Sequence, residues 1–123
     1  MRRMLLTVAI GLGALLFASP SWAGDAAAGE VIFVTNCATC HGTGGKGDGP
    51  VGKALTPTPR DFTTGDFKFD TDEDGTPGTD VDIRNVIANG GGAYGGSPLM
   101  APWPTLSDED VSNVIVYIRS LKQ

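Results

Sequence analysis

The fold of this chain is decided by the stretch Cys37-Ala38-Thr39-Cys40-His41, in which two cysteines two residues apart are followed directly by a histidine. This is the spacing of a covalent haem attachment site. Thiols at positions i and i+3 lie on one side of a helical turn, where they can add to the two vinyl groups of one haem. The adjacent imidazole can then bind the iron as an axial ligand. These residues are the only cysteines and the only histidine of the chain, so the motif predicts one covalently bound haem.

Three other uses of the motif fit the remaining sequence less well. A structural zinc site requires four ligands, and the Cys and His side chains of this chain number three, all within five residues. A thioredoxin-like redox pair requires a strand-to-helix junction in a βαβ unit, whereas the pattern around Cys37 is helical and no parallel-sheet pattern follows. A simple disulfide in an exported protein leaves the adjacent His41 unexplained.

Residues 1–23 have the pattern of a cleaved export signal. Arg2 and Arg3 are basic, residues 4–18 are apolar, and Ser21-Trp22-Ala23 provides small residues at the expected cleavage positions. The apolar run is short for a helix that spans a bilayer, so we expect removal of the signal and no stable insertion into a membrane. Residues 24–123 would then form a single exported domain, and a bacterial periplasm is the expected location.

The composition of residues 24–123 predicts a domain that depends on its cofactor for a core. This part contains 16 glycines and seven prolines, residue types that disfavour regular helices and strands. A domain of this size buries little apolar surface by itself, and a haem can serve as the apolar centre. The same residues carry 14 Asp and Glu against seven Lys and Arg, a balance that argues against a nucleic-acid partner.

The hydrophobic pattern predicts an all-α fold with a long loop-rich middle over residues 42–78. Helices are expected over about Ala26–Cys40, Asp80–Asn89 and Asp108–Leu121. Each expected helix follows capping residues, namely Asp25, Thr79 with Asp82, and Ser107 with Asp110. Helical spacing predicts buried apolar faces made of Ala28, Val31, Ile32 and Phe33 on the first helix and of Val111, Val114, Ile115, Ile118 and Leu121 on the last.

Over the whole of residues 24–123, the chain resembles the class I c-type cytochromes, which are small monohaem electron carriers. Besides the attachment motif, Gly29 and Phe33 stand eight and four residues before Cys37. In the family, a glycine and an aromatic residue at these places let the first helix cross closely against the last. The resemblance implies that their partners here are Val114 and Tyr117, and that long loops surround one buried haem.

The resemblance also implies a second iron ligand and a support for the first. Met100 is the only methionine of residues 24–123 and lies in a Pro- and Gly-rich loop before the last helix, where the family has its ligand methionine. Ala101 follows it, where many members have proline. Gly49-Pro50 resembles the Gly-Pro pair whose proline carbonyl accepts a hydrogen bond from the haem histidine. We therefore expect His41 and Met100 as axial ligands of the iron, with Pro50 orienting the His41 ring.

Other pocket residues are assigned with an alternative beside each. Arg60 resembles an arginine that pairs with a haem propionate in relatives, and a guanidinium suits a carboxylate, but it could equally be a solvated loop residue. Trp103 and Tyr94 could line the pocket or simply fill the core. The run Asp70-Thr71-Asp72-Glu73-Asp74-Gly75 opens like a calcium-binding EF-hand loop, but Val81 occupies the twelfth position, where a bidentate glutamate is required. An acidic solvated loop is the expected structure.

The resemblance implies an electron-transfer protein and not an enzyme. With the one histidine assigned to iron, the sequence offers no Ser–His or Cys–His nucleophile pair. We expect a monomer that passes one electron between periplasmic redox partners, and the acidic charge of residues 24–123 predicts docking to a basic patch on the partner. Two alternatives stay open: a haem subunit of a larger oxidoreductase, and a haem enzyme or gas sensor with five-coordinate iron.

Overall fold

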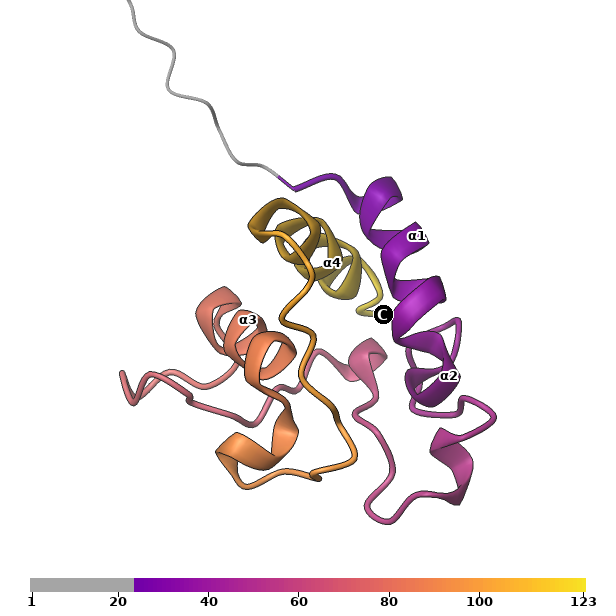
Figure 1. The fold of residues 1–123 in the computed structure, drawn as a ribbon, viewed down its shortest axis with the longest axis horizontal. Coiled ribbons are helices and arrows are strands. Elements are labelled where there is room, and N and C mark those ends of the chain that lie inside the picture. Colours follow the sequence, from indigo (N-terminus) through magenta and orange to yellow (C-terminus); the bar gives the residue numbers. More distant parts are fainter. Residues whose placement is uncertain (1–23) are drawn as a thin grey trace, which may run out of the picture.

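The computed structural model describes residues 24–123, so the predicted export signal at residues 1–23 lies outside the described residues. Within this range the chain is helical, without a strand, as the all-α prediction requires. The helices are α1 (Ala26–Asn36), α2 (Ala38–His41), α3 (Asp80–Asn89) and α4 (Asp108–Ser120), and three short 3₁₀ helices are η1 (Gly52–Ala54), η2 (Phe62–Thr64) and η3 (Gly91–Tyr94). Figure 1 shows α1 and α2 forming one arm of the molecule, with α4 beside α1 and α3 on the other side of α4.

The predicted first helix is divided in two at Cys37. Two polar side chains at the end of α1 bond back to carbonyls one turn earlier: the Thr35 hydroxyl donates to Val31 at 2.7 Å and the Asn36 amide donates to Ile32 at 3.0 Å. Such bonds compete with the regular backbone ladder. Cys37 stays in the right-handed helical region, but its φ of −114° with ψ −31° is far from the regular helical value. The consequence is that α2 is a separate turn carrying Cys40 and His41.

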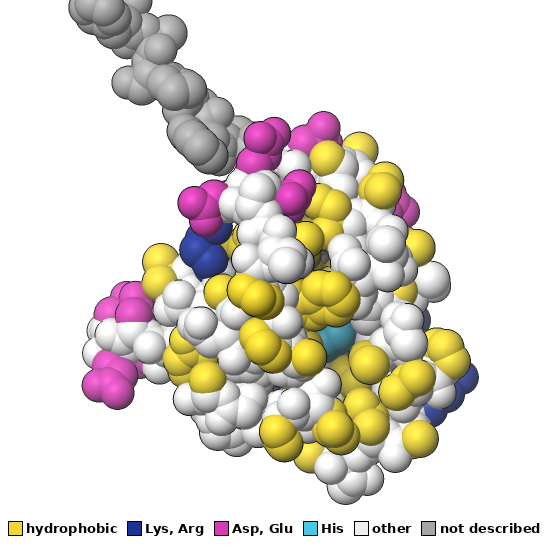
Figure 2. All heavy atoms as spheres, viewed as in Figure 1, with side chains coloured by type: hydrophobic (Ala, Val, Ile, Leu, Met, Phe, Trp, Pro, Cys, Tyr) yellow, Lys and Arg dark blue, Asp and Glu magenta, His cyan; other side chains and the backbone are white. Residues whose placement is uncertain are grey.

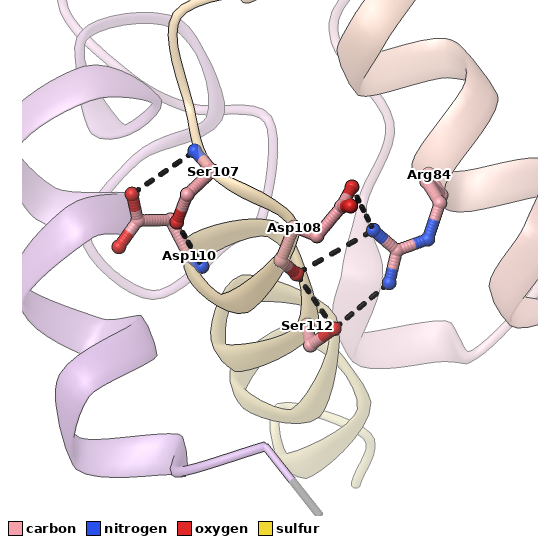
Figure 3. Close-up of polar contacts among 5 residues, drawn as sticks. All are labelled: Arg84, Ser107, Asp108, Asp110 and Ser112. Atoms are coloured by element: carbon pink, nitrogen blue, oxygen red, sulfur yellow. Dashed lines mark hydrogen bonds and ion pairs between the residues drawn. The ribbon is translucent and has the colours of Figure 1, made fainter. Parts of the chain in front are cut away.

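The predicted helix starts are confirmed. The Asp25 carboxylate accepts the backbone N–H of Ala27 at 2.8 Å, which satisfies an otherwise free donor of the first turn of α1. Capping boxes open both later helices, formed by Thr79 with Asp82 at α3 and by Ser107 with Asp110 at α4. Figure 3 shows the box at α4, where each of the two side chains bonds the other residue's backbone.

The crossing of α1 and α4 depends on Gly29 and Phe33. A Cβ atom at Gly29 would overlap the carbonyl oxygen of Asn113, so glycine permits the two backbones to touch. Phe33 is fully buried, and its ring centroid lies 5.2 Å from that of Tyr117. The backbone N–H of Asp25 also donates to the Asn113 side chain at 2.7 Å. Tyr117 therefore packs at the crossing, and Val114 is buried in the same core cluster as Phe33, while the backbone of Asn113 lies nearest to the glycine.

The apolar face predicted for α1 is wrong at Val31, which is 67% exposed. The buried residues of this helix are Gly29 and Phe33, with Ala28 and Ile32 half-buried. Because α1 is apolar on nearly all sides, hydrophobic spacing does not identify the buried face. The face predicted for α4 is confirmed, since its first four members are buried and Leu121 is half-buried.

Two arginines attach α3 and the preceding loop to α4. Arg84 on α3 contacts the Asp108 carboxylate at 3.4 Å and donates to the Ser112 hydroxyl at 2.8 Å (Figure 3). Arg119 on α4 donates to the Asp80 carboxylate at 2.8 Å and to the Gly78 carbonyl at 2.7 Å. Among residues 24–123, no helix is long and apolar enough to cross a membrane.

Candidate functional site

His41 ends α2 and is held by two neighbours. Its Nδ1 atom lies 3.2 Å from the carbonyl oxygen of Arg60. Because a carbonyl only accepts, this hydrogen bond places the proton of the neutral ring on Nδ1 and leaves the lone pair of Nε2 for a metal. The ring of Phe62 stacks on the imidazole, with centroids 4.6 Å apart and planes 18° from parallel. Burial lowers the pKa of His41, against the opposing effect of the Arg60 carbonyl, so the neutral form, which is able to bind a metal, is favoured.

The structure places the Arg60 carbonyl beside Nδ1 of His41, and the role expected of Pro50 stays a prediction. Pro50 is exposed, and the segment around it contacts the backbone of α2 instead. The N–H of Gly49 donates to the Cys40 carbonyl and that of Val51 donates to the Thr39 carbonyl, both at 3.1 Å. A Cβ at Gly49 would come within 2.7 Å of three carbonyl oxygens of α2. The segment therefore caps the last carbonyls of α2, while the bond to the imidazole comes from a later residue.

The two cysteines lie on the same turn as His41. The N–H groups of Cys40 and His41 both point to the Cys37 carbonyl, at 3.2 and 2.9 Å. Both thiols are free and half-buried. Burial, with a smaller contribution from Cys40, raises the pKa of Cys37 to about 11. The spacing thus gives the geometry that haem attachment requires, with two thiols and one imidazole on a single turn.

Met100 lies in the loop that joins η3 to α4. The loop is fixed to the end of α3, because Gly91 donates to the Met100 carbonyl at 2.9 Å and Trp103 donates to the Ile87 carbonyl at 2.8 Å. Gly91 also leaves room for the Met100 side chain, which a Cβ at that position would approach to 3.1 Å. In the view of Figure 1 the loop passes between α3 and the arm formed by α1 and α2.

The weaker pocket assignments have different outcomes. Trp103 is half-buried and packs against the core cluster. The Tyr94 hydroxyl accepts a hydrogen bond from the Asn89 side chain at 2.7 Å. The Arg60 side chain is exposed, so the structure ties this residue to His41 through its carbonyl, while a propionate contact stays a prediction. The contact of Phe62 with His41 was not predicted from the sequence. An aromatic residue in a loop carries no pattern that indicates its partner, and the position shortly after Arg60 is the one hint.

The surface around His41 suits an apolar macrocycle. Figure 2 shows the one histidine of the chain partly covered at the bottom of a recess edged by hydrophobic side chains. Leu99 and Val51, which adjoin Met100 and Pro50 in the sequence, are 64% and 47% exposed. Met100, Trp103 and both cysteines are half-buried. A flat apolar cofactor bound to the two thiols would bury such surface, at about 25 cal/mol per Å² removed from water. The residues present therefore fit a haem.

The acidic loop contains a compact cluster of carboxylates. Asp70, Asp72 and Asp74 offer oxygen atoms that all lie within 4.8 Å of one another. The Asp70 carboxylate already accepts the N–H groups of Asp74 and Gly75. The loop leads into the Thr79 cap of α3, as expected for an acidic turn before a helix.

Comparisons with known proteins place this geometry in a family. The family model for cytochrome c matches residues 26–122. Cytochrome c6 of Picosynechococcus sp. is 32% identical over 121 residues, which cover 94% of this chain and 92% of that protein. Cytochrome c-554(547) of Halothiobacillus neapolitanus is 33% identical over 102 residues, covering 81% of this chain and all of that protein.

A solved structure shows the same fold in a larger chain. It belongs to the reducing HAO-like protein complex of Kuenenia stuttgartiensis, and the match has a TM-score of 0.65 and 35% identity. The matched region covers 77% of this chain but only 41% of that chain. The family model and the two relatives therefore support the covalently bound haem that the attachment motif predicts. The protein belongs to the cytochrome c family, and it is a c-type cytochrome that carries covalently bound haem c and functions as an electron carrier.

Proposed function

We propose that this protein is a free monohaem carrier, exported to the periplasm, that passes one electron between protein partners through iron ligated by His41 and Met100. The observation that carries the proposal is the state of the His41 ring. It follows directly after two free thiols on the same turn, and its Nδ1 is committed to the Arg60 carbonyl. Only Nε2 then remains for a metal.

Each proposed ligand has a distinct role. Cys37 and Cys40 would hold the haem through two thioether bonds, and His41 would bind its iron through Nε2. Met100 would supply a thioether sulfur, a ligand that favours the ferrous state and raises the reduction potential relative to a second histidine. The haem iron supplies the one-electron chemistry by cycling between two oxidation states. The hydrogen bonds of Gly91 to the Met100 carbonyl and of Trp103 to the Ile87 carbonyl would hold the Met100 loop in place.

The proposed location rests on residues 1–23. Removal of this segment as an export signal leaves the domain of residues 24–123. Gly24 packs against the Ser112 carbonyl and Val116 of α4. Cleavage before Gly24 would therefore keep the residues that contact α4. Mass spectrometry of the protein purified from the periplasmic fraction tests the cleavage site.

The distribution of charge supports docking to a partner with basic groups. On the face shown in Figure 2, hydrophobic side chains gather around His41, and acidic side chains lie beyond them over the start of α4 and the loop before α3. Acidic groups on that side of the molecule would steer a basic partner during the encounter, while the apolar surface would make the final contact. Electron-transfer rates with the partner should fall as ionic strength rises. Flat or rising rates would argue against a basic partner.

The match to a chain of a larger complex supports one alternative, a haem subunit of an oxidoreductase. A free carrier purifies alone as a monomer, whereas a subunit co-purifies with other chains even at high salt. Size-exclusion chromatography at low and high salt separates the two functions. The other alternative is a five-coordinate haem enzyme or sensor, which would bind carbon monoxide readily.

Optical spectroscopy of the wild type and two Met100 variants tests the ligands directly. The oxidised wild type should be low-spin, with a weak near-infrared band from charge transfer between methionine and iron. Met100→Ala should lose the band, lower the reduction potential and open the iron to carbon monoxide. Met100→His should lose the band and lower the potential while the iron stays six-coordinate. A wild type that lacks the band and binds carbon monoxide would instead favour the enzyme or sensor function.

A further inference from the structure

We infer that Phe62 is a positioning residue that sets the orientation of the His41 ring. The inference rests on the proposed role of His41 as an iron ligand and names a residue that supports that role. Of the recorded aromatic neighbours of His41, Phe62 is the one stacked on it, at 4.6 Å and 18°. Phe33 lies farther away, at 6.4 Å, and is tilted by 50°. Phe62 therefore restrains the plane of the imidazole, whereas Phe33 only fills space beside it.

Two contacts together restrict rotation of the His41 ring about its Cβ–Cγ bond. The Arg60 carbonyl oxygen lies 3.2 Å from Nδ1 and accepts its hydrogen bond. The Phe62 ring covers one face, so a rotation that moved Nδ1 from its acceptor would also drive the imidazole edge into the phenyl group. Partners of this kind orient a metal-binding histidine and tune its basicity. Because Arg60 and Phe62 are separated by one residue, a single short segment provides both contacts.

Phe62 is itself held firmly on the η2 turn. Its N–H donates to the Gly45 carbonyl at 2.7 Å. The preceding Asp61 caps the turn by accepting the N–H of Thr63 at 2.9 Å and the hydroxyl of Thr63 at 2.6 Å. Gly45 has a φ of 69°, and a Cβ at this position would meet the Phe62 ring and overlap Leu121. The side chain that stacks on the imidazole thus rests on a turn with its own fixed geometry.

A second ring supports Phe62 from the η2–α3 loop. Phe67 stacks on Phe62 with centroids 5.9 Å apart and planes 20° from parallel. The Arg119 guanidinium lies 4.9 Å from the centre of the Phe67 ring. Arg119 is anchored in turn by the Asp80 carboxylate and the Gly78 carbonyl. A continuous series of contacts therefore runs from the proposed iron ligand His41 through Phe62 and Phe67 to Arg119 of α4. Because α4 is packed in the core, this series restrains the movement of the imidazole.

The decisive comparison is between Phe62→Leu and Phe62→Tyr in the haem-loaded protein. Leucine keeps apolar volume but has no flat face, so the imidazole should sample more orientations. Electron paramagnetic resonance of the low-spin ferric iron should then show shifted and broadened g values, and the reduction potential should shift. Tyrosine keeps the flat ring and should restore both readouts to wild-type values. Val111→Ala, a core truncation in the first turn of α4, is the control: it should lower the Tm and leave the g values unchanged.

The outcomes separate a positioning role from a structural one. If Phe62→Leu lowers the Tm as Val111→Ala does, with wild-type g values and potential, the positioning role is overturned while the carrier function stands. If the oxidised wild type is not low-spin, the His41–Met100 ligation fails, and the inference fails with it. Phe67→Leu keeps the test informative where Phe62→Leu does not mature: we expect the same direction of change with a smaller shift, and unchanged g values would overturn the inference.

Discussion

The α1–α4 crossing and the surface around His41 differ in where their apolar side chains are buried. At the crossing, Phe33 is fully buried and Val114 is 1% exposed, both within contacts between helices of the chain. In the loop before α4, which the second region includes with the surface around His41, Leu99 is 64% exposed, and Met100 and Trp103 are half-buried. The comparison indicates that the polypeptide alone determines the crossing, whereas the loops of the second region acquire their full apolar contacts with haem.

Loss of haem attachment should have the largest effect on this comparison. We expect the double variant Cys37→Ala/Cys40→Ala to lack covalent haem and to lose most tertiary structure, because the loops between η1 and α4 then bury little apolar surface. Near-ultraviolet circular dichroism should flatten. Hydrogen exchange should find any remaining protection in α1 and α4. The matched control is Thr39→Ala, at an exposed position of the same motif, which should mature normally.

If the double variant lacks haem but its loops are still protected from hydrogen exchange, the loops do not depend on haem for their structure, and the comparison is wrong. Acid–acetone extraction of the wild type gives a second check. The colour should stay on the protein, and titration of the unfolded haem-loaded protein should find no free thiol.

Gly29→Ala should be the most damaging single substitution at the crossing. The added methyl group would overlap the Asn113 carbonyl, which belongs to backbone and cannot move aside without shifting α4. We expect a loss of about 3 kcal/mol in the free energy of unfolding, measured by denaturation in guanidinium chloride. Gly44→Ala is the matched control, because a Cβ there meets nothing within 4 Å, and it should change stability by less than about 0.5 kcal/mol. Equal effects of the two substitutions would show that the helices are not in close contact.

Asp82→Asn should have a smaller effect that depends on pH. The Asp82 carboxylate is buried and accepts hydrogen bonds from the N–H and hydroxyl groups of both Thr71 and Thr79. Burial raises its pKa, but the four hydrogen bonds outweigh this effect and hold the pKa below its ordinary value. In asparagine an NH₂ group replaces one carboxylate oxygen. That NH₂ group would face the N–H and hydroxyl groups that donated to the oxygen, so we expect the Tm at neutral pH to fall by about 10 °C.

The sign of the pH dependence follows from the lowered pKa. The ionised Asp82 stabilises the fold fully above the pKa of an unfolded aspartate, about 3.9, and this contribution is lost as pH falls below that value. The difference in Tm between wild type and Asp82→Asn should therefore shrink in acid. Asp72→Asn should change the Tm in the opposite direction. Desolvation and the neighbouring Asp74 raise the pKa of Asp72, so its ionised form disfavours the fold, and the substitution should raise the Tm at neutral pH. Parallel Tm profiles for wild type and Asp82→Asn would show that the charge of Asp82 is not used.

The sequence predicted the parts of this structure that depend on local signals. The attachment motif led to the haem, and the caps at Thr79 and Ser107 predicted where α3 and α4 begin. The parts that were not predicted depend on tertiary contacts. The acceptor for His41 lies 19 residues away, at the Arg60 carbonyl, and a backbone carbonyl has no residue-type signature. Val31 was placed in the core because α1 is apolar on most sides, and only the position of α4 determines which side is buried.

Arg119→Gln should have the smallest effect, and it tests the link between the two regions. Arg119 joins α4, part of the crossing, to Asp80 and the Phe67 ring of the second region. The ion pair is exposed, with 38% and 71% of the two side chains accessible. The pair and the cation–π contact should together contribute about 1 kcal/mol at low salt, and part of this should disappear in high salt. Denaturation at two salt concentrations measures both quantities. Lys68→Gln is the matched control, because its pair with Asp66 is exposed on both sides, and it should be nearly neutral. If Arg119→Gln is equally neutral, the contacts of Arg119 contribute nothing to holding the two regions together, and the link rests on the other contacts, such as those of Arg84 with α4.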